Sequence, residues 1–473
     1  MQITSMHFKR QAREKLADAH LREALSGLQD RFVRGRAEAI TELDNFEDIR
    51  EAAKQIRNRA LAALDVYLEE FERNATARGA VVHWAETAAE VTEIVCNLAE
   101  LYGVRKAIKS KSMVSEEVSL NDALEAAGVE VVETDLGEYI LQLAHEAPSH
   151  IIAPVIHKRK DEVSDLFARK HATERKTDIG ELTREAREVL RPHFLSADMG
   201  ISGANFLVAE TGTTMIVTNE GNGRMVTTLP RIHVAITGIE KVVPTLEDVA
   251  TLMRLLPRSA TGQSISNYVS LTTGKRAPGD VDGPEHFHIV LVDAGRSRLL
   301  ATELKEALRC IRCGACMNHC PVYQVIGGHA YGWVYPGPIG SILTPSYVGI
   351  ENALDLPQAS TFCNQCGVVC PVKIPLPDLQ RKLRERQFER GLRPWYERAG
   401  LRLWGWLARR PALYALATRI GVRLLASLGG ADRMIHALPF GSGWTAERDM
   451  PAPQGRTFRE LYSDRINRMN RTG

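Results

Sequence analysis

The sequence predicts a mostly parallel, three-layer α/β domain, followed by a cysteine-rich segment and a helical, arginine-rich C-terminal region. Short strand-like runs alternate with amphipathic helices between residues 80 and 292. Seven of the eight cysteines lie between 310 and 370, and residues 372–473 contain 20 Lys and Arg against nine Asp and Glu. Strands that alternate with helices of this length are typical of βαβ units and hence of a parallel sheet.

The overall composition is that of an ordinary globular protein. The 473 residues are 44% hydrophobic and 25% charged, with a formal net charge of +2. This balance argues against wholesale disorder, a multi-span membrane protein and a dedicated nucleic-acid-binding protein. No secretory signal is visible at the N-terminus, so we expect a reducing, cytoplasmic location in which clustered cysteines bind metal.

The predicted elements follow from periodicity. The first seventy-odd residues are predicted to be helical, because apolar residues recur at helical spacing over 48–73. Strands are predicted at 80–85, 129–134, 151–155, 206–209, 214–218, 233–237 and 288–292, and helices at 87–101, 137–144, 161–170, 246–255 and 298–308. We therefore expect an N-terminal helical region at 1–75, the α/β domain at 76–297, a cysteine-rich domain at 298–380 and a basic C-terminal region at 381–473.

Residues 321–350 contain no Asp, Glu, Lys or Arg, but they are not predicted to span a membrane. The stretch includes six glycines and four prolines. Backbone amides freed by these residues would lack partners in lipid. The segment is predicted to be an irregular strap, buried against the protein or docked on a partner.

The first cysteine run is Cys310, Cys313, Cys316 and Cys320, followed by a proline. This C-x2-C-x2-C-x3-C-P spacing is that of bacterial ferredoxins, which hold cubane iron–sulfur clusters. The alternative is a zinc site, which normally uses two cysteine pairs rather than a triple. The run therefore favours iron–sulfur chemistry.

The second run is Cys363, Cys366 and Cys370, again followed by a proline, with Ser360 where a first cysteine would stand. In two-cluster ferredoxins the last cysteine of each run binds the other cluster. This rule predicts a first cluster held by Cys310, Cys313, Cys316 and Cys370, and a second held by Cys320, Cys363 and Cys366. The second is either a four-iron cluster with a serine, water or other ligand, or a three-iron cluster.

Two further residues that could bind a metal are not expected to be ligands. Cys96 lies on the apolar face of a predicted helix, which favours a buried thiol over a fourth ligand for the second cluster. His319, beside Cys320, is expected to tune a cluster rather than bind it. The chain has no flavin or nicotinamide fingerprint in the right context: the G-x-G-x-x-A match at 441–446 has no preceding strand, and 273–276 is not a P-loop. Two clusters alone imply electron relay, with a donor on another subunit.

The chain resembles the lactate utilization protein B family, the iron–sulfur subunit of a bacterial L-lactate oxidising system. The resemblance is carried by FLSADMGISGAN at 194–205, ETGT at 210–213, TNEGN at 218–222 and the two cysteine runs, and it covers nearly the whole chain. It implies a lactate-utilisation domain similar in fold to sugar-phosphate isomerases and CoA transferases, and a helical two-cluster ferredoxin-like domain. It also implies L-lactate oxidation to pyruvate with two companions, one a cysteine-rich iron–sulfur subunit and the other a single lactate-utilisation domain.

The α/β domain has its own candidate site for a small anion. Polar residues gather at predicted strand ends and turns, where open α/β sheets bind ligands: Glu210, Thr211, Thr213, Asn219, Glu220 and Asn222. The competing interpretation is a hairpin turn at 219–223. His193 and His233 are interpreted as structural histidines. An alternative function is therefore a stand-alone isomerase- or CoA-transferase-like enzyme with structural clusters.

The C-terminal region contains a basic amphipathic pattern. Tryptophans and leucines between 404 and 425 are flanked by arginines. Such a pattern docks on a partner subunit, packs on the protein's own core, or lies on the anionic inner face of the membrane. A redox-sensing regulator that binds nucleic acid through this tail is a third hypothesis, but no helix-turn-helix or RNA-binding motif accompanies it.

Overall fold

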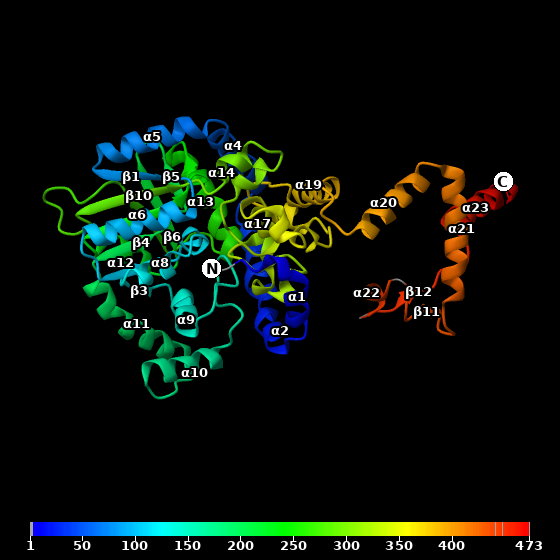
Figure 1. The fold of residues 1–473 in the computed structure, drawn as a ribbon, viewed down its shortest axis with the longest axis horizontal. Coiled ribbons are helices and arrows are strands. Elements are labelled where there is room, and N and C mark those ends of the chain that lie inside the picture. Colours follow the sequence, from blue (N-terminus) through cyan, green and yellow to red (C-terminus); the bar gives the residue numbers. More distant parts are fainter. Residues whose placement is uncertain (1–2, 440, 447, 473) are drawn as a thin grey trace. The chain divides into compact units, whose positions relative to one another are not determined.

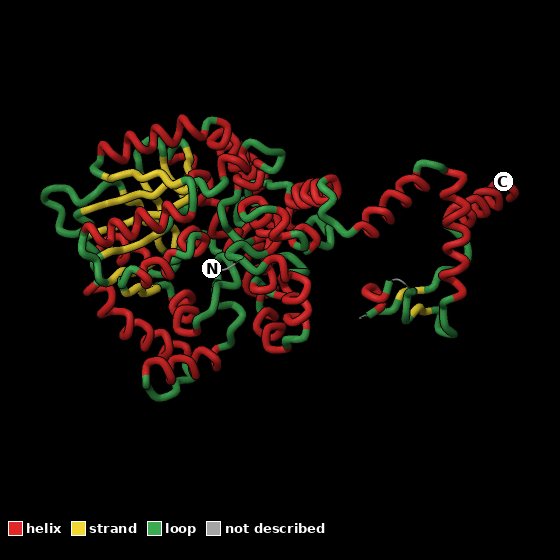
Figure 2. The backbone as a smooth tube through the Cα atoms, viewed as in Figure 1, coloured by secondary structure: helices red, strands yellow, loops and turns green. Residues whose placement is uncertain are grey.

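The computed structural model describes residues 3–439, 441–446 and 448–472, and it divides into two compact units, Met1–Gln387 and Phe388–Gly473. Figure 1 shows the order of the elements along the chain, and Figure 2 shows the strands of the first unit gathered together with helices around them. The predicted combination of an α/β domain with helical regions is confirmed.

The core of the first unit is a six-stranded, fully parallel sheet. Its strands, in spatial order, are β1 (Ala80–Ala85), β10 (His286–Val292), β7 (Ile232–Gly238), β4 (Met199–Ser202), β2 (Lys106–Lys109) and β3 (Glu130–Glu133). The predicted strands at 80–85, 129–134, 233–237 and 288–292 are confirmed. Strands β2 and β4 were not predicted, because they are four residues long and too deeply buried to show an alternating pattern.

Helices cover both faces of this sheet, which confirms three layers. Along β10, Val290 and Val292 pack with α6 (Ala88–Leu101) and α8 (Leu120–Ala126), whereas Ile289 and Leu291 pack with α5 (Leu64–Ala77). This alternation follows from the two-residue period of a strand. Helices α7 (Met113–Glu117), α9 (Leu136–Ala144), α10 (Lys160–His171) and α11 (Ile179–Ser196) complete the region after β2.

Four further strands, which fall in sequence between β4 and β10 of the main sheet, form a smaller sheet. Its order is β8 (Val242–Val243), β5 (Phe206–Val208), β6 (Thr213–Thr218) and β9 (Tyr268–Thr272). The strands predicted at 206–209 and 214–218 are confirmed as β5 and β6, which pair antiparallel. The hairpin turn proposed for 219–223 is wrong, because β6 leads directly into helix α12 (Asn222–Thr228). The predicted helix at 246–255 is α13 (Leu246–Thr261).

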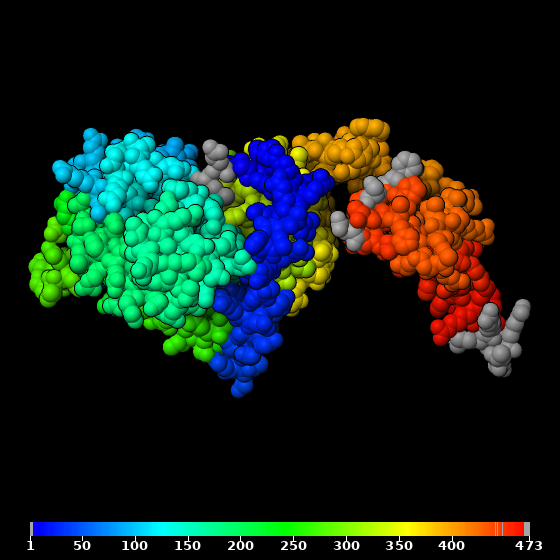
Figure 3. All heavy atoms as spheres, turned by 90° about the horizontal axis from the view of Figure 1, so that it is seen from below, coloured from blue at the N-terminus to red at the C-terminus, as the bar shows by residue number. Residues whose placement is uncertain are grey.

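The N-terminal residues are helical, as predicted. The elements are α1 (Phe8–Leu16), α2 (Ala19–Ser26), η2 (Gln29–Arg34), α3 (Gly35–Thr41), α4 (Phe46–Ala62) and α5. The helical pattern at 48–73 is broken at Ala63, where φ is −131°. Helices α1 and α2 pack against the cysteine-rich segment, and Figure 3 shows these blue helices lying against the yellow part of the chain.

The cysteine-rich segment is built from short helices. They are α14 (Arg296–Leu300), η4 (Lys305–Arg309), α15 (Ala315–Asn318), α16 (Tyr323–Ile326), η5 (His329–Tyr331), α17 (Gly337–Tyr347), η6 (Ile350–Ala353), η7 (Leu356–Gln358), α18 (Gln365–Val369) and α19 (Leu376–Glu389). The single helix predicted at 298–308 is wrong, since the Thr302 side chain bonds to Leu299 and Leu304 backbone groups and interrupts it.

Two further predictions need correction here. The strand predicted at 151–155 is wrong: these residues form a turn-rich loop in which only Ile151 and Pro154 are buried and no neighbouring strand pairs with them. The strap at 321–350 is largely buried against its own chain, which is one of the two outcomes predicted from the sequence. It is not irregular throughout. Helix α17 takes up a third of it and buries every side chain from Gly337 to Pro345.

The second unit contains α20 (Trp395–Ala408), α21 (Pro411–Ser427), the two-stranded pair β11 (Met434–Ile435) and β12 (Met450–Pro451), α22 (Ser442–Thr445) and α23 (Phe458–Thr472). Helices α20 and α21 bury none of their residues. Within the described ranges, no helix is both long enough and apolar enough to cross a membrane.

Candidate functional site

The first cysteine run turns tightly because two of its residues adopt left-handed backbone conformations. Arg312 has a φ of 59° and Gly314 has a φ of 73°, so the chain reverses direction on either side of Cys313. The peptide N–H of Arg312 donates to the Cys310 sulfur at 3.4 Å. Helix α15 follows at once and carries Cys316. The run thus places Cys310, Cys313 and Cys316 around one cavity.

The second cysteine run repeats this backbone. Phe362 has a φ of 54° and Asn364 has a φ of 64°, on either side of Cys363, and α18 then begins. The peptide N–H of Phe362 donates to Ser360 Oγ at 3.2 Å. Ser360 therefore occupies the position that the first cysteine has in the other run, and its oxygen accepts the same type of hydrogen bond.

The structure brings the seven cysteines into two groups. Cys310, Cys313, Cys316 and Cys370 line one small cavity, together with apolar side chains from α17 and the chain after 370. The other group is Cys320, Cys363 and Cys366. Burial and the nearby Cys320 and Cys363 together raise the pKa of the Cys366 thiol to about 12. These are the two sets that the ferredoxin crossing rule predicts; ligation itself stays a prediction.

The donor set fits iron–sulfur clusters. Thiolates are the ligands of such clusters, and backbone N–H groups that donate to their sulfurs stabilise them. Besides the Arg312 bond, the Ile374 N–H donates to Cys370 Sγ at 3.4 Å. In the described part of the chain, no three His, Cys, Asp or Glu side chains are grouped as ligands of a single metal ion. The first set of cysteines surrounds a cavity instead.

Buried cations surround the first group. Arg50 of α4 donates to the Cys370 carbonyl and to the Val368 carbonyl, and Arg36 of α3 donates to the Val369 carbonyl. Both residues are 7% exposed, and Arg50 also pairs with Glu47 at 2.5 Å. Because a buried cation is costly unless a negative charge lies near it, this environment suits an anionic cluster held by thiolates.

The second group is more open to solvent. Cys363 is exposed, whereas Cys320 and Cys366 are buried. His319 donates its Nδ1–H to the Ala315 carbonyl at 2.9 Å, and its role in tuning a cluster stays a prediction. Cys96 joins neither group, since its sulfur contacts the Ala123 carbonyl at 3.8 Å between α6 and α8.

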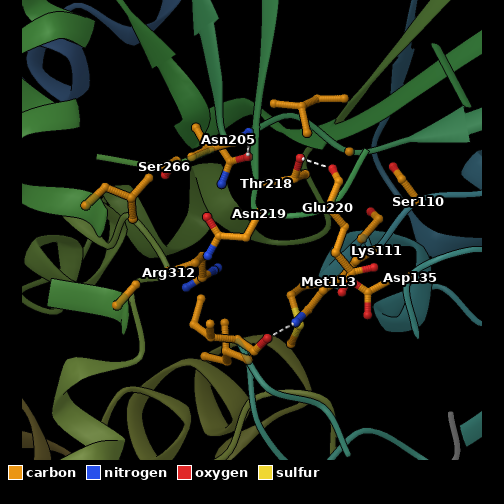
Figure 4. A pocket seen from close by; sticks show the side chains of 18 of the residues that line it. Ser110, Lys111, Met113, Asp135, Asn205, Thr218, Asn219, Glu220, Ser266 and Arg312 are labelled. Atoms are coloured by element: carbon orange, nitrogen blue, oxygen red, sulfur yellow. Dashed lines mark hydrogen bonds between the residues drawn. The ribbon is translucent and has the colours of Figure 1, made fainter. Parts of the chain in front are cut away.

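A pocket of about 360 Å³ adjoins the first group of cysteines. It lies where β2, β3, β4 and β7 end, which is the edge at which parallel sheets bind ligands. Figure 4 shows Arg312 and Asn219 on one side of it and Lys111, Asp135 and Glu220 on the other. Arg312 lines both this pocket and the cavity of the four cysteines.

Charged groups in the pocket have shifted pKa values. Burial lowers the pKa of Lys241 to about 7, with repulsion from Arg312 adding to the effect. Burial and the neighbouring Asp135 raise the pKa of Glu220 to about 7. Arg312 pairs with Glu240 at 3.5 Å and lies over the Tyr335 ring. The pocket therefore presents cations at one part of its wall and a carboxyl that holds a proton near neutral pH.

Only half of the anion site predicted from sequence lies in this pocket. Asn219, Glu220 and Asn222 line it. Glu210, Thr211 and Thr213 do not: Glu210 accepts a hydrogen bond from the backbone N–H of Leu246 at the start of α13, and the two threonines join a chain of hydroxyls with Thr273. The prediction missed three pocket cations, Lys111, Lys241 and Arg312. The only available signal was that the two lysines follow strand-like residues.

His193 and His233, which are interpreted from the sequence as structural, both lie away from the pocket. His233 is fully buried in β7, where its Nε2 bonds to Ser202 Oγ at 2.7 Å, and burial lowers its pKa to about 3. His193 lies on α11 near Lys106 and Glu130. Neither lines the pocket.

Comparisons with known proteins agree along the whole chain. Family models match the LUD domain at residues 68–292, the 4Fe-4S dicluster domain at 306–374 and the C-terminal region of lactate utilisation protein B at 378–467. Lactate utilization protein B of Geobacillus kaustophilus is 44% identical, with 98% of each chain covered. The proteins of the same name from Bacillus licheniformis and Bacillus subtilis are 42% and 41% identical; for the first of these, 98% of each chain is covered.

Proposed function

Because the chain belongs to the lactate utilization protein B family, we propose that it is the electron-transfer subunit of a complex that oxidises L-lactate to pyruvate. The chain contains a 4Fe-4S dicluster domain, and its family name gives it an iron–sulfur role in lactate utilisation. The observation that carries the relay is the pair of adjacent cysteine groups, one enclosed beside the pocket and one open to solvent. Electrons would enter at the first and leave at the second.

The proposed ligands follow from this grouping. Cys310, Cys313, Cys316 and Cys370 would hold the first cluster, and Cys320, Cys363 and Cys366 the second. Ser360 stands at the fourth position of the second set, since its Oγ accepts the hydrogen bond that a sulfur accepts in the first. We infer that Ser360 faces the iron that no cysteine binds.

The proposed partners are the two companions that the family resemblance implies, a cysteine-rich iron–sulfur subunit and a single lactate-utilisation domain. Helices α20 and α21 are the proposed docking surface, because they bury no residue and carry exposed Trp404, Leu416 and Ile420 among arginines. A soluble complex of the cytoplasm, or one held at the inner face of the membrane by this basic surface, would both use it.

Anaerobic purification and electron paramagnetic resonance test the proposal. The protein should be brown, contain about seven to eight iron atoms per chain, and show two cluster signals that lactate reduces when both companions are present. Stoichiometric zinc with no visible absorbance would contradict it. So would clusters that stay oxidised in the complete, lactate-oxidising complex.

The alternative of a stand-alone isomerase- or CoA-transferase-like enzyme loses its main candidate. Glu210, on which that hypothesis relied, is exposed and accepts the Leu246 N–H at 2.6 Å. A carboxylate at a helix N-terminus satisfies an otherwise free amide and needs no catalytic explanation.

A further inference from the structure

Two buried polar atoms without hydrogen-bond partners, and one buried lysine, line the pocket beside the first cysteine group. Ser110 Oγ and Asn222 Oδ1 form no hydrogen bond with any described residue, and their residues are 2% and 6% exposed. Lys241 is 6% exposed and forms no hydrogen bond or ion pair in the described chain. A buried polar group without a partner costs about 1–3 kcal/mol, so such groups are rare unless something binds them.

Lys241 is the one of four neighbouring buried cations that lacks a direct partner among the described residues. Arg57 donates to the carbonyls of Val242, Glu240 and Leu308. Arg296 pairs with Glu117 and Glu240, and Arg312 pairs with Glu240. Two carboxylates thus pair with Arg296 and Arg312. Glu240 also attracts the Lys241 ammonium but forms no ion pair with it, so that ammonium faces the pocket. Its position selects an anion.

The rest of the wall suits a small organic molecule. Ile216, Ile236 and Leu256 contribute apolar surface, and the Ser110 hydroxyl and the Asn222 amide oxygen can bond to a hydroxyl group. The pocket has several times the volume of a three-carbon acid, so such an acid would occupy only the part next to Lys241 and Arg312. Carboxylates bind most strongly to charged donors of this kind.

The pocket and the first cysteine group share a wall. Ile151 and Arg312 each line both cavities, and Arg312 lies in sequence between Cys310 and Cys313. A molecule bound at Lys241 would therefore lie one side chain away from the first cluster.

We propose that this pocket binds the carboxylate of a 2-hydroxy acid, or of the 2-oxo acid formed from it, with Lys241 and Arg312 as its charged partners. The choice of acid rests on the proposed function. The site assigns substrate binding to this chain, next to the cluster at which electrons enter the relay.

Calorimetric titration of the anaerobic holoprotein with L-lactate, pyruvate, acetate and inorganic phosphate tests the site, with the resonance spectrum of the reduced clusters as a second readout. L-lactate or pyruvate should bind and shift the first cluster's signal. Lys241→Met should weaken that binding by about thirtyfold or more, because it removes the charge that faces the carboxylate. The matched control is Lys305→Met, since Lys305 is exposed and lies outside the pocket.

Three results would overturn the inference: no binding of either acid, equal binding by Lys241→Met and wild type, or phosphate binding that matches and displaces the acids. If Lys241→Met does not fold, Ser110→Ala serves instead, as it removes an unpartnered hydroxyl without changing charge, and it should weaken acid binding. A holoprotein with both cluster signals and no response to the acids refutes this site and leaves the proposed relay intact. A protein that binds the acids but holds no clusters supports this site and refutes the proposed relay.

Discussion

The two halves of the cysteine repeat share one backbone and differ in what they offer a cluster. Around Cys313 and Cys363 the chain uses the same pair of left-handed residues, followed by the same short helix. The first half belongs to a set of four cysteines that lines a cavity, whereas the second belongs to a set of three and has an exposed cysteine and a serine. The same turn geometry thus accommodates different chemistry, because serine and cysteine accept the same backbone hydrogen bond.

The difference in enclosure suggests different tasks. The first group adjoins the pocket and lies among buried arginines, so its cluster would be stabilised electrostatically, and none of its four cysteines is exposed. The second reaches the surface at Cys363, where a partner could approach. Removing one cysteine from each group tests whether the two groups differ in this way.

Cys316→Ala should have the largest effect. We expect loss of the first cluster and a fall in the free energy of unfolding of about 3–5 kcal/mol, because an enclosed cavity would be left empty and the buried Arg36 and Arg50 would lose the charge of the cluster, leaving Glu47 as the carboxylate beside them. Cys363→Ala should cost only the second cluster and about 1 kcal/mol, because its side chain is exposed. Iron content, resonance spectra and denaturant unfolding measure both. Equal losses of stability in the two variants would show that the groups do not differ in this way.

Ser360→Cys should have an intermediate effect, since it makes the second half match the first. A fourth thiolate at this position should give a four-iron cluster that resists oxygen and shows no three-iron signal after oxidation. Ser360→Ala is the matched control and should lose an iron more readily than wild type. Resonance spectra of the oxidised proteins separate these cases. Identical spectra for all three proteins would mean that Ser360 does not face the cluster.

Periodicity predicted most of the fold because the longer elements obey it. The helix at 87–101 and the strand at 288–292 each show a clear apolar pattern, and both are present. The failures have local causes. The strand predicted at 151–155 found no partner, and the helix at 298–308 was interrupted by Thr302, whose side chain competes for backbone hydrogen bonds. In both segments, apolar character alone did not identify the secondary structure.

The two cysteine groups followed from spacing, whereas the pocket did not. The spacing of the ligands is local in sequence, so the positions of Cys310 and Cys313 alone indicate iron–sulfur chemistry. The pocket joins Ser110, Lys241 and Arg312 from segments more than 70 residues apart, and their meeting depends on strand order and on how the cysteine segment packs on the sheet. Glu210 and Asn219 are both polar residues after a predicted strand, so the sequence did not distinguish them. In the structure Asn219 lines the pocket, whereas Glu210 caps the start of α13.

Cys96→Ser should have the smallest effect, and it tests whether the eighth cysteine completes the second group. Cys96 is half-buried on α6, and burial raises the pKa of its thiol, which disfavours a thiolate ligand. We expect unchanged iron content and spectra, and a loss of less than about 1 kcal/mol from placing a hydroxyl beside the apolar core. Cys96→Ala is the control for that polarity. Loss of the second cluster's signal in either variant would assign Cys96 as the missing ligand, and would leave Ser360 as no more than a turn residue.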